Sequence, residues 1–98
     1  MGMLDKMNKM RDLKKMTDEI NKLEFSATSK DGKIKTTVKG DFTVKSVELD
    51  PSLMDGSMKI EAIQKLVVDT LNRSISEARG TVQKKTQQMA KDMGIGFK

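Results

Sequence analysis

The hydrophobic residues of this 98-residue chain change their spacing twice, which divides the chain into three segments. Over residues 3–24 apolar side chains recur every three or four positions, as on one side of a helix. Over residues 25–50 they alternate with polar side chains, as in half-buried strands. Over residues 58–93 the helical spacing returns. The pattern predicts an α+β fold of order α-β-β-β-α, with a three-stranded antiparallel meander between an N-terminal helix and a long C-terminal helix, and we expect residues 1–98 to form one domain.

The apolar stripe of the N-terminal helix is not straight. Its mean step is about 3.3 residues, shorter than the roughly 3.6 residues of a helical turn, so the stripe rotates by about 160° along the helix. Such a helix is suited to docking on its own domain at one end and on a second subunit at the other. The stripe consists of Met3, Met7, Met10, Leu13, Met16, Ile20 and Leu23.

Turn residues separate the predicted strands. Asp31-Gly32 and Gly40-Asp41 are typical of tight turns. The alternation slips by one residue in the third strand, which predicts a β-bulge near Lys45-Ser46. Asp50 followed by Pro51 is typical of the capped start of a short helical turn.

The long C-terminal helix indicates a second chain. With Ser57 as its cap, residues 58–93 would form a helix about 54 Å long that contains Gly80, where a bend is possible. A compact chain of this length has a radius of gyration of about 13 Å, so it is only about 34 Å across. Part of the helix, its C-terminal half, must therefore protrude or pack against another chain.

The composition also favours a homodimer, because only 36% of the residues are hydrophobic, which is little for a self-sufficient core. We assign the dimer interface to apolar positions of the third strand and of the first half of the long helix. They are Val44, Val47, Leu49, Ile60, Ile63, Val67, Leu71 and Ile75.

The net charge of +5 favours polyanionic partners: nucleic acid, an anionic membrane surface or an acidic protein. The chain has neither His nor Cys, so the commonest general base and the strongest nucleophile are missing. We therefore expect no enzyme, no cofactor, no metal site and no small-molecule substrate. Residues 1–9 contain no apolar run typical of a signal peptide, and no stretch is long and apolar enough to span a membrane. The expected location is the cytoplasm.

Basic residues gather on both helices. In the N-terminal helix four of them lie within about 100° of arc, opposite the apolar stripe. Around the C-terminal helix, residues 78–93 hold four basic residues and one acid, and Arg73, Lys84 and Lys91 share a stripe. A solvated helix face is one interpretation; the other is a surface that contacts the phosphates of duplex DNA. The candidate DNA contacts are Lys6, Lys9, Arg11, Lys14, Lys15, Arg73, Arg79, Lys84, Lys85 and Lys91.

Other clusters leave alternatives open. No aromatic residue interrupts the basic clusters, so the pattern favours duplex binding without base stacking and with little sequence selectivity. Lysines of the strand segment (Lys33, Lys35, Lys39, Lys45) are interpreted as protection of sheet edges. The methionines of the first helix are interpreted as packing at a helix–helix seam, to which Met89 and Met93 would contribute from the long helix. The alternative function of the Met-rich helices is a protein–protein interaction module. Membrane-surface binding is disfavoured because the first helix lacks Trp and carries Asp12 and Glu19 on one flank.

The segment Val44–Leu53, with the pattern Val-x-x-Val-x-Leu-Asp-Pro-Ser-Leu, is the most specific part of a resemblance that covers nearly the whole chain. The chain resembles the YbaB/EbfC nucleoid-associated proteins of bacteria. The resemblance implies a tweezer-like homodimer with paired sheets and projecting helices. It also implies DNA binding in the nucleoid, with an effect on gene expression or nucleoid organisation. Further matching segments are Glu24-Phe25 at the end of the first helix, Val38-Lys39-Gly40, residues 66–72 and residues 93–97.

Overall fold

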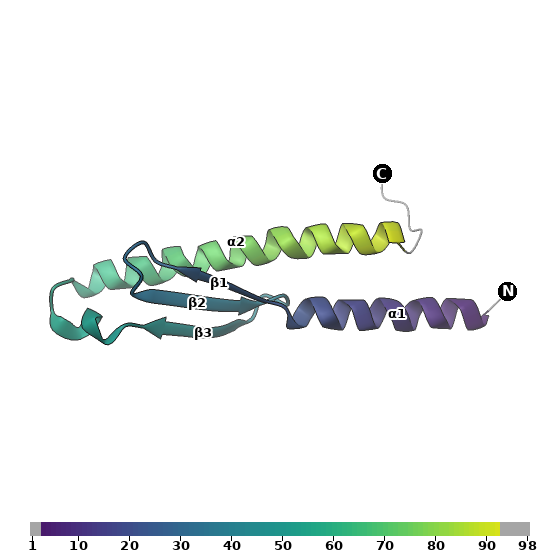
Figure 1. The fold of residues 1–98 in the computed structure, drawn as a ribbon, viewed down its shortest axis with the longest axis horizontal. Coiled ribbons are helices and arrows are strands. Elements are labelled where there is room, and N and C mark those ends of the chain that lie inside the picture. The colour runs from purple at the N-terminus through teal and green to yellow at the C-terminus, as the bar shows by residue number, and fades with distance from the viewer. Residues whose placement is uncertain (1–2, 93–98) are drawn as a thin grey trace.

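The fold is α+β in the predicted order (Figure 1). The computed structural model describes the backbone of residues 3–92 and the side chains of residues 11–92. The elements are α1 (Met3–Lys22), β1 (Glu24–Thr28), β2 (Ile34–Lys39), β3 (Val44–Leu49), the 3-10 helix η1 (Pro51–Asp55) and α2 (Ile60–Asp92). The strands pair antiparallel in the order β1-β2-β3, which confirms the meander.

The predicted bulge in β3 is present. Thr37 pairs with Ser46 and Val38 pairs with Val44, so Lys45 is the extra residue of β3. Because one residue is inserted, the side chains of Val44 and Val47 lie on the same face of the sheet although three positions separate them.

The predicted cap at Asp50 is present where the chain leaves the sheet after β3. The backbone N–H of Ser52 donates to Asp50 Oδ1 at 2.8 Å, and Pro51 is the first residue of η1. This N–H donation holds the pKa of Asp50 below its ordinary value of 3.8. The stabilisation that accompanies the lowered pKa is therefore present above about pH 4 and is lost in more acidic solution, as Asp50 becomes protonated in the folded chain.

Two predicted helix boundaries need correction. α1 ends at Lys22, because Glu24 already pairs with Lys39 in the sheet. Ser57 is not the cap of the long helix, which begins only at Ile60. Instead the backbone N–H of Ser57 donates to Asp55 Oδ1 at 2.8 Å, so Ser57 helps to close the turn after η1.

The core lies between α2 and the β1–β2 half of the sheet. Phe25, Val38 and Ala78 form its buried centre. Leu23, Leu71, Ile75 and Val82 are partly buried and pack against that centre. α2 lies mainly over β1 and β2 (Figure 1), so the edge strand β3 is left without a helix above it.

Buried hydroxyl groups fix α2 on the sheet. Thr36 Oγ1 forms a hydrogen bond with Ser74 Oγ and donates to the carbonyl oxygen of Thr70 at 3.2 Å. All three residues are at most 1% exposed. A shift of α2 along the sheet would leave these groups unpaired, at a cost of about 1–3 kcal/mol for each. The hydroxyl cluster therefore sets the position of the helix.

The molecule is long and thin, 68 × 24 × 16 Å, with a radius of gyration of 19.0 Å. α2 continues as a helix through Gly80. After the buried core residue Ala78, residues 79–92 of α2, of which Val82 still packs on the core, extend in the same region as α1 with the opposite chain direction (Figure 1). We call this pair of segments, residues 3–22 and 79–92, the arm. The predicted protrusion of the C-terminal half of the long helix is confirmed.

The arm joins the sheet at a close backbone contact. The N–H of Gly40, in the β2–β3 turn, donates to the carbonyl oxygen of Leu23 at 2.8 Å. A Cβ atom at position 40 would lie 1.9 Å from the carbonyl oxygen of Ile20. Only glycine lets the end of α1 approach this turn so closely.

Gly40→Ala is expected to lower stability by about 2 kcal/mol or more, because the backbone at the end of α1 must move away from the turn. The matched variant is Gly80→Ala, since a Cβ at Gly80 meets nothing within 4 Å. That change should raise stability by about 1 kcal/mol, or about 4–8 °C in Tm. Thermal unfolding followed by circular dichroism measures both. Equal shifts for the two variants would contradict the proposed role of Gly40.

Candidate functional site

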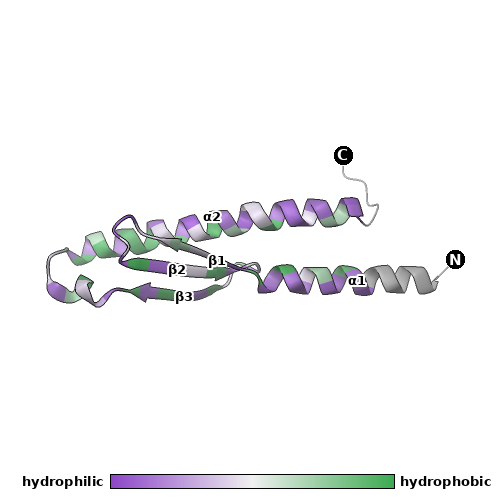
Figure 2. Ribbon diagram, in the orientation of Figure 1, coloured by the Kyte–Doolittle hydropathy of each residue, from purple (hydrophilic) through white to green (hydrophobic). Residues whose placement is uncertain are grey.

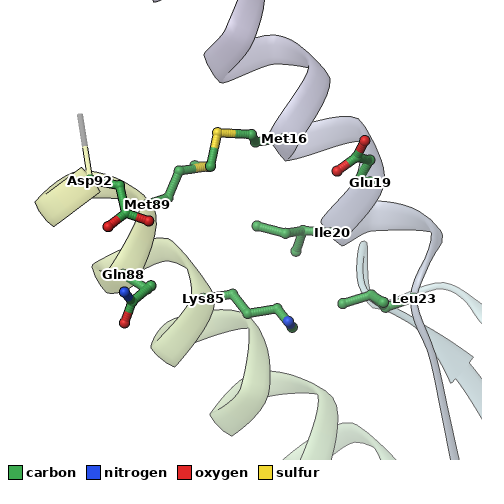
Figure 3. Close-up of a pocket in the computed structure, with 8 residues that line it drawn as sticks. All are labelled: Met16, Glu19, Ile20, Leu23, Lys85, Gln88, Met89 and Asp92. Atoms are coloured by element: carbon green, nitrogen blue, oxygen red, sulfur yellow. The ribbon is translucent and has the colours of Figure 1, made fainter.

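The two helices of the arm meet along a seam of apolar side chains. Met16 and Ile20 of α1, with Leu23 just after its end, face Lys85 and Met89 of α2 across a pocket of about 280 Å³ (Figure 3). The side chains of Met16 and Met89 point toward each other, as expected for methionines at a helix–helix seam. Met93, assigned to the same seam, lies outside the described residues.

The basic side chains of α1 fall into two groups. Arg11, Lys14 and Lys22 are exposed on the side of the helix opposite Ile20, by the rotation of about 100° per residue. Lys15 is also exposed, but it lines a second pocket beside the seam with Glu19 and Asp92. The side chains of Lys6 and Lys9 lie outside the described part of the chain. For the described residues, α1 therefore offers three outward cations.

The basic side chains of α2 also divide. Arg73, Lys84 and Lys91 lie within about 20° of one line along the helix. Lys85 points into the seam toward α1, as Figure 3 shows. Arg79 is exposed about 120° away from Arg73 around the helix. Arg73 is engaged by the sheet, because its guanidinium donates to the carbonyl oxygen of Thr28. Lys84 and Lys91 are thus the two exposed cations of this line that lie on the arm, and Arg79 is a third exposed cation on another side of the helix.

Charge is distributed unevenly between the arm and the rest of the chain. The arm carries ten basic and five acidic residues, and the other 64 residues carry nine of each. The whole net charge of +5 therefore resides on the arm, and the remainder of the chain is neutral. Figure 2 shows that the C-terminal half of α2 is also mostly hydrophilic.

The interpretation of the sheet lysines as edge protection is wrong for two of them. Lys35 and Lys39 lie on β2, which is the central strand. Lys45 does lie on the edge strand β3, and its Nζ is 2.8 Å from Glu24 Oε2 in an exposed ion pair. Such a pair contributes little to stability, about 0–1 kcal/mol. The sheet face that carries these lysines also carries Glu24 and Glu48, the cross-strand partners of Lys39 and Lys35.

An open apolar surface lies beside α2. Val44, Val47 and Leu49 are paired with Val38, Thr36 and Ile34, so they share the sheet face that α2 covers elsewhere. They are nevertheless 41–48% exposed, because α2 does not reach over β3. We call this surface, together with the exposed side chains of Ile60 and Val68 on α2, the open face.

The residues assigned to the dimer interface differ in how much they are exposed. Ile63 and Val67 are half-buried. Leu71 and Ile75 are also partly buried, because they pack against the core of their own chain. The sequence reasoning missed Phe42, Met54 and Val68, three exposed apolar residues. The predicted apolar stripe of the long helix was too narrow to include Val68. Phe42 lies in the β2–β3 turn and Met54 in η1, so neither is part of a strand or an α-helix.

Phe42 combines exposure with backbone strain. It is 47% exposed in the β2–β3 turn, and its φ of +67° is in the left-handed region. Its N–H donates to the carbonyl oxygen of Lys39 at 2.8 Å, which closes the turn. Asparagine and glycine tolerate this conformation, whereas other residues are strained by about 1–2 kcal/mol.

Two substitutions separate the strain at Phe42 from its side chain. Phe42→Asn and Phe42→Val both remove the ring, but only asparagine accepts the left-handed conformation readily. We expect the asparagine variant to be more stable than the valine variant by about 1 kcal/mol. Urea unfolding at one protein concentration measures the difference. A valine variant as stable as the asparagine variant would show that the turn relaxes out of the left-handed region.

The described residues show no metal centre and no membrane span. Within residues 11–92 no group of three or more acidic side chains is placed to hold a metal ion. Neither helix, over its described length, has the apolar stretch needed to cross a bilayer. The features that stand out are therefore the basic arm and the open face.

Comparison with known proteins identifies the family of this chain. The model of the YbaB/EbfC DNA-binding family matches residues 1–93. A protein of Brucella ovis named nucleoid-associated protein is 31% identical over 101 aligned positions, which cover all of this chain and 94% of the relative. An uncharacterized protein of Mycoplasma genitalium is 33% identical over 69 residues, 70% of this chain and 68% of that protein.

A solved structure supports the fold independently. The crystal structure of an uncharacterized protein from Helicobacter pylori matches with a TM-score of 0.64 and 18% identity, covering 90% of this chain and 99% of that one. At this identity the likeness concerns the fold alone. Taken with the match over residues 1–93, these findings show that the chain belongs to the YbaB/EbfC DNA-binding family.

Proposed function

We propose that this protein binds duplex DNA with little sequence selectivity, as a homodimer, through phosphate contacts made by its arm. The observation that carries the proposal is the confinement of the whole net charge to the arm. A surface of Lys and Arg that projects from a neutral body can approach a duplex without interference from the rest of the chain. Family membership supports the same function.

The contacts that we propose are the outward cations of the arm. The exposed basic side chains that point away from the seam are Lys84 and Lys91 of α2 and Arg11, Lys14 and Lys22 of α1. Each can neutralise a phosphate and release a counterion without reading a base. Lys15 and Lys85 lie at the seam. They would raise the positive electrostatic potential of the arm without contacting a phosphate directly. Arg79 and Arg73 remain secondary contacts, as do Lys6 and Lys9.

Dimerisation is the second part of the proposal. The open face exposes a row of apolar side chains on an edge strand, which in an isolated chain invites association. A second copy that covers the open face would bury Val44, Val47 and Leu49 and leave both arms free. Two arms on one dimer would contact more phosphates than one arm, and the protein could thereby organise nucleoid DNA or influence gene expression. Such a protein would act in the cytoplasm, on the nucleoid.

The alternative of a Met-based interaction module has less support. Of the methionines whose side chains are described, Met16 and Met89 are engaged with each other at the seam. They are therefore not an open hydrophobic surface for another helix. No catalytic role is proposed, since the family is one of DNA-binding proteins.

A comparison of three polyanions tests the proposal. Labelled duplex DNA, single-stranded DNA of the same length and vesicles of anionic lipid are each titrated with the protein. We expect the duplex to bind more tightly than the single strand, because the basic surface has no aromatic side chain on which unpaired bases could stack. The vesicles should retain no protein in flotation. Retention on vesicles without binding to the duplex would contradict the proposal.

A further inference from the structure

A groove of about 650 Å³ lies on the flank of α2 opposite the open face. The β1–β2 turn reaches the N-terminal half of α2 there (Figure 1), and it contributes Ser29 and Lys30 to the groove. Arg73, which donates to Thr28 at the end of β1, lies on the same flank. By contrast, Ile60 and Val68, the α2 residues of the open face, lie about 140° around the helix from Arg73. A second copy seated on the open face would therefore leave the groove accessible.

The floor of the groove is apolar. Met58 enters from the segment before α2, and Ala62 and Leu66 follow one turn apart on the helix. Met58 and Leu66 are half-buried, and Ala62 is exposed. A concave apolar surface of this kind gains free energy when a hydrophobic side chain fills it.

The rim of the groove is basic. Lys30, Lys65 and Arg73 surround the floor, and Asp69 is the acidic residue of the lining. Asn72 adds an amide that can donate to or accept from a bound backbone. The groove thus pairs an apolar floor with an excess of two positive charges.

We propose that this groove binds an acidic, amphipathic segment of a partner protein. Apolar side chains of the segment would fill the floor, and its carboxylates would meet the three cations of the rim, as when an amphipathic helix docks in a groove. A duplex fits less well, because its phosphates offer nothing to Met58 and Leu66 and are repelled by Asp69. A second copy of this basic chain lacks the complementary charge.

The test uses a fluorescein-labelled peptide in which leucines at i, i+3, i+4 and i+7 are set among glutamates. A second peptide has serine in place of each leucine and the same charge. Ala62→Glu places a carboxylate on the floor at an exposed helix position, and Gln87→Glu makes the same charge change about 37 Å farther along α2. Fluorescence anisotropy of the full chain with each peptide gives the affinities.

The leucine peptide should bind, and Ala62→Glu should weaken it by about tenfold or more, against less than about twofold for Gln87→Glu. Equal binding of the serine peptide would overturn the proposal, because charge alone would then explain the affinity. No effect of Ala62→Glu, or no binding of either peptide, would overturn it as well.

Two further outcomes identify a different occupant. If Ala62→Glu changes the mass of the protein in light scattering, the groove is an interface between copies of the chain. If Ala62→Glu weakens duplex binding more than Ser46→Glu, which adds the same charge to the sheet face turned away from α2, and no peptide binds, the groove is part of the DNA surface. Neither outcome depends on whether the arm binds DNA, so failure of this proposal is distinguishable from failure of the proposed function.

Discussion

Replacing both Lys84 and Lys91 with alanine is expected to weaken binding to every duplex alike. Both side chains are outward on the arm, and each neutralised phosphate contributes about 0.9 to the slope of log affinity against log salt. Loss of two contacts should lower the magnitude of that slope by about 2 for each protomer that touches the duplex. For one protomer in contact with the duplex, the corresponding loss of affinity is on the order of 50-fold at 0.1 M salt, and this factor is squared if both arms of a dimer touch the duplex.

The matched control removes two lysines from the neutral body. Lys35 and Lys59 are exposed and lie outside the arm. Lys35→Thr with Lys59→Ala makes the same change in net charge, so any effect of total charge alone is shared by the two double variants. Anisotropy titrations at several salt concentrations compare them. Equal slopes for the two double variants would show that the arm is not the contact surface.

Val47→Asp is expected to separate the proposed dimer into single chains. Val47 is at the middle of the open face, and burial of an unpaired carboxylate there costs several kcal/mol, about 3–5. Light scattering at micromolar concentration should show a mass of about twice 11.0 kDa for the unaltered protein and near 11.0 kDa for the variant. The Tm should fall too, because burial in the partner is lost.

The neighbouring position provides the control for Val47. Ser46 pairs with Thr37, so it lies on the other face of the same strand, away from the open face. Ser46→Asp adds the same charge to the same strand and should leave the mass at the dimer value. A Val47→Asp variant that keeps the dimer mass would contradict the assignment of the open face as the interface.

The fold could be predicted from local patterns because its elements are regular. The change from helical to alternating spacing placed both helices and all three strands. The one-residue slip of the alternation located the bulge at Lys45, and Asp50-Pro51 located the start of η1. Ser57 was misassigned because a serine can close a turn as readily as it can cap a helix, and its backbone was needed for the turn.

The site was only partly predictable, because its parts depend on tertiary placement. The arc of basic residues on α1 was visible in the sequence, but the separation of Lys84 from Lys85 required knowing which side of α2 faces α1. The partition of charge between arm and body depends on the residue at which α2 leaves the sheet. The apolar spacing of α2 does not change at that residue, so the sequence does not reveal it. The groove brings Lys30 and Met58 beside Leu66, residues that are far apart in sequence and meet only in the folded chain.

The central claim, that the arm binds duplex DNA through phosphates, is tested most directly by anisotropy on two duplexes of unrelated sequence. The protein is titrated against each at salt concentrations from about 50 to 200 mM, where phosphate-driven affinity falls steeply. The account predicts similar affinities for the two duplexes and the same steep decline with salt. Absence of binding at the lowest salt, or tight binding to one duplex that salt hardly weakens, would contradict it.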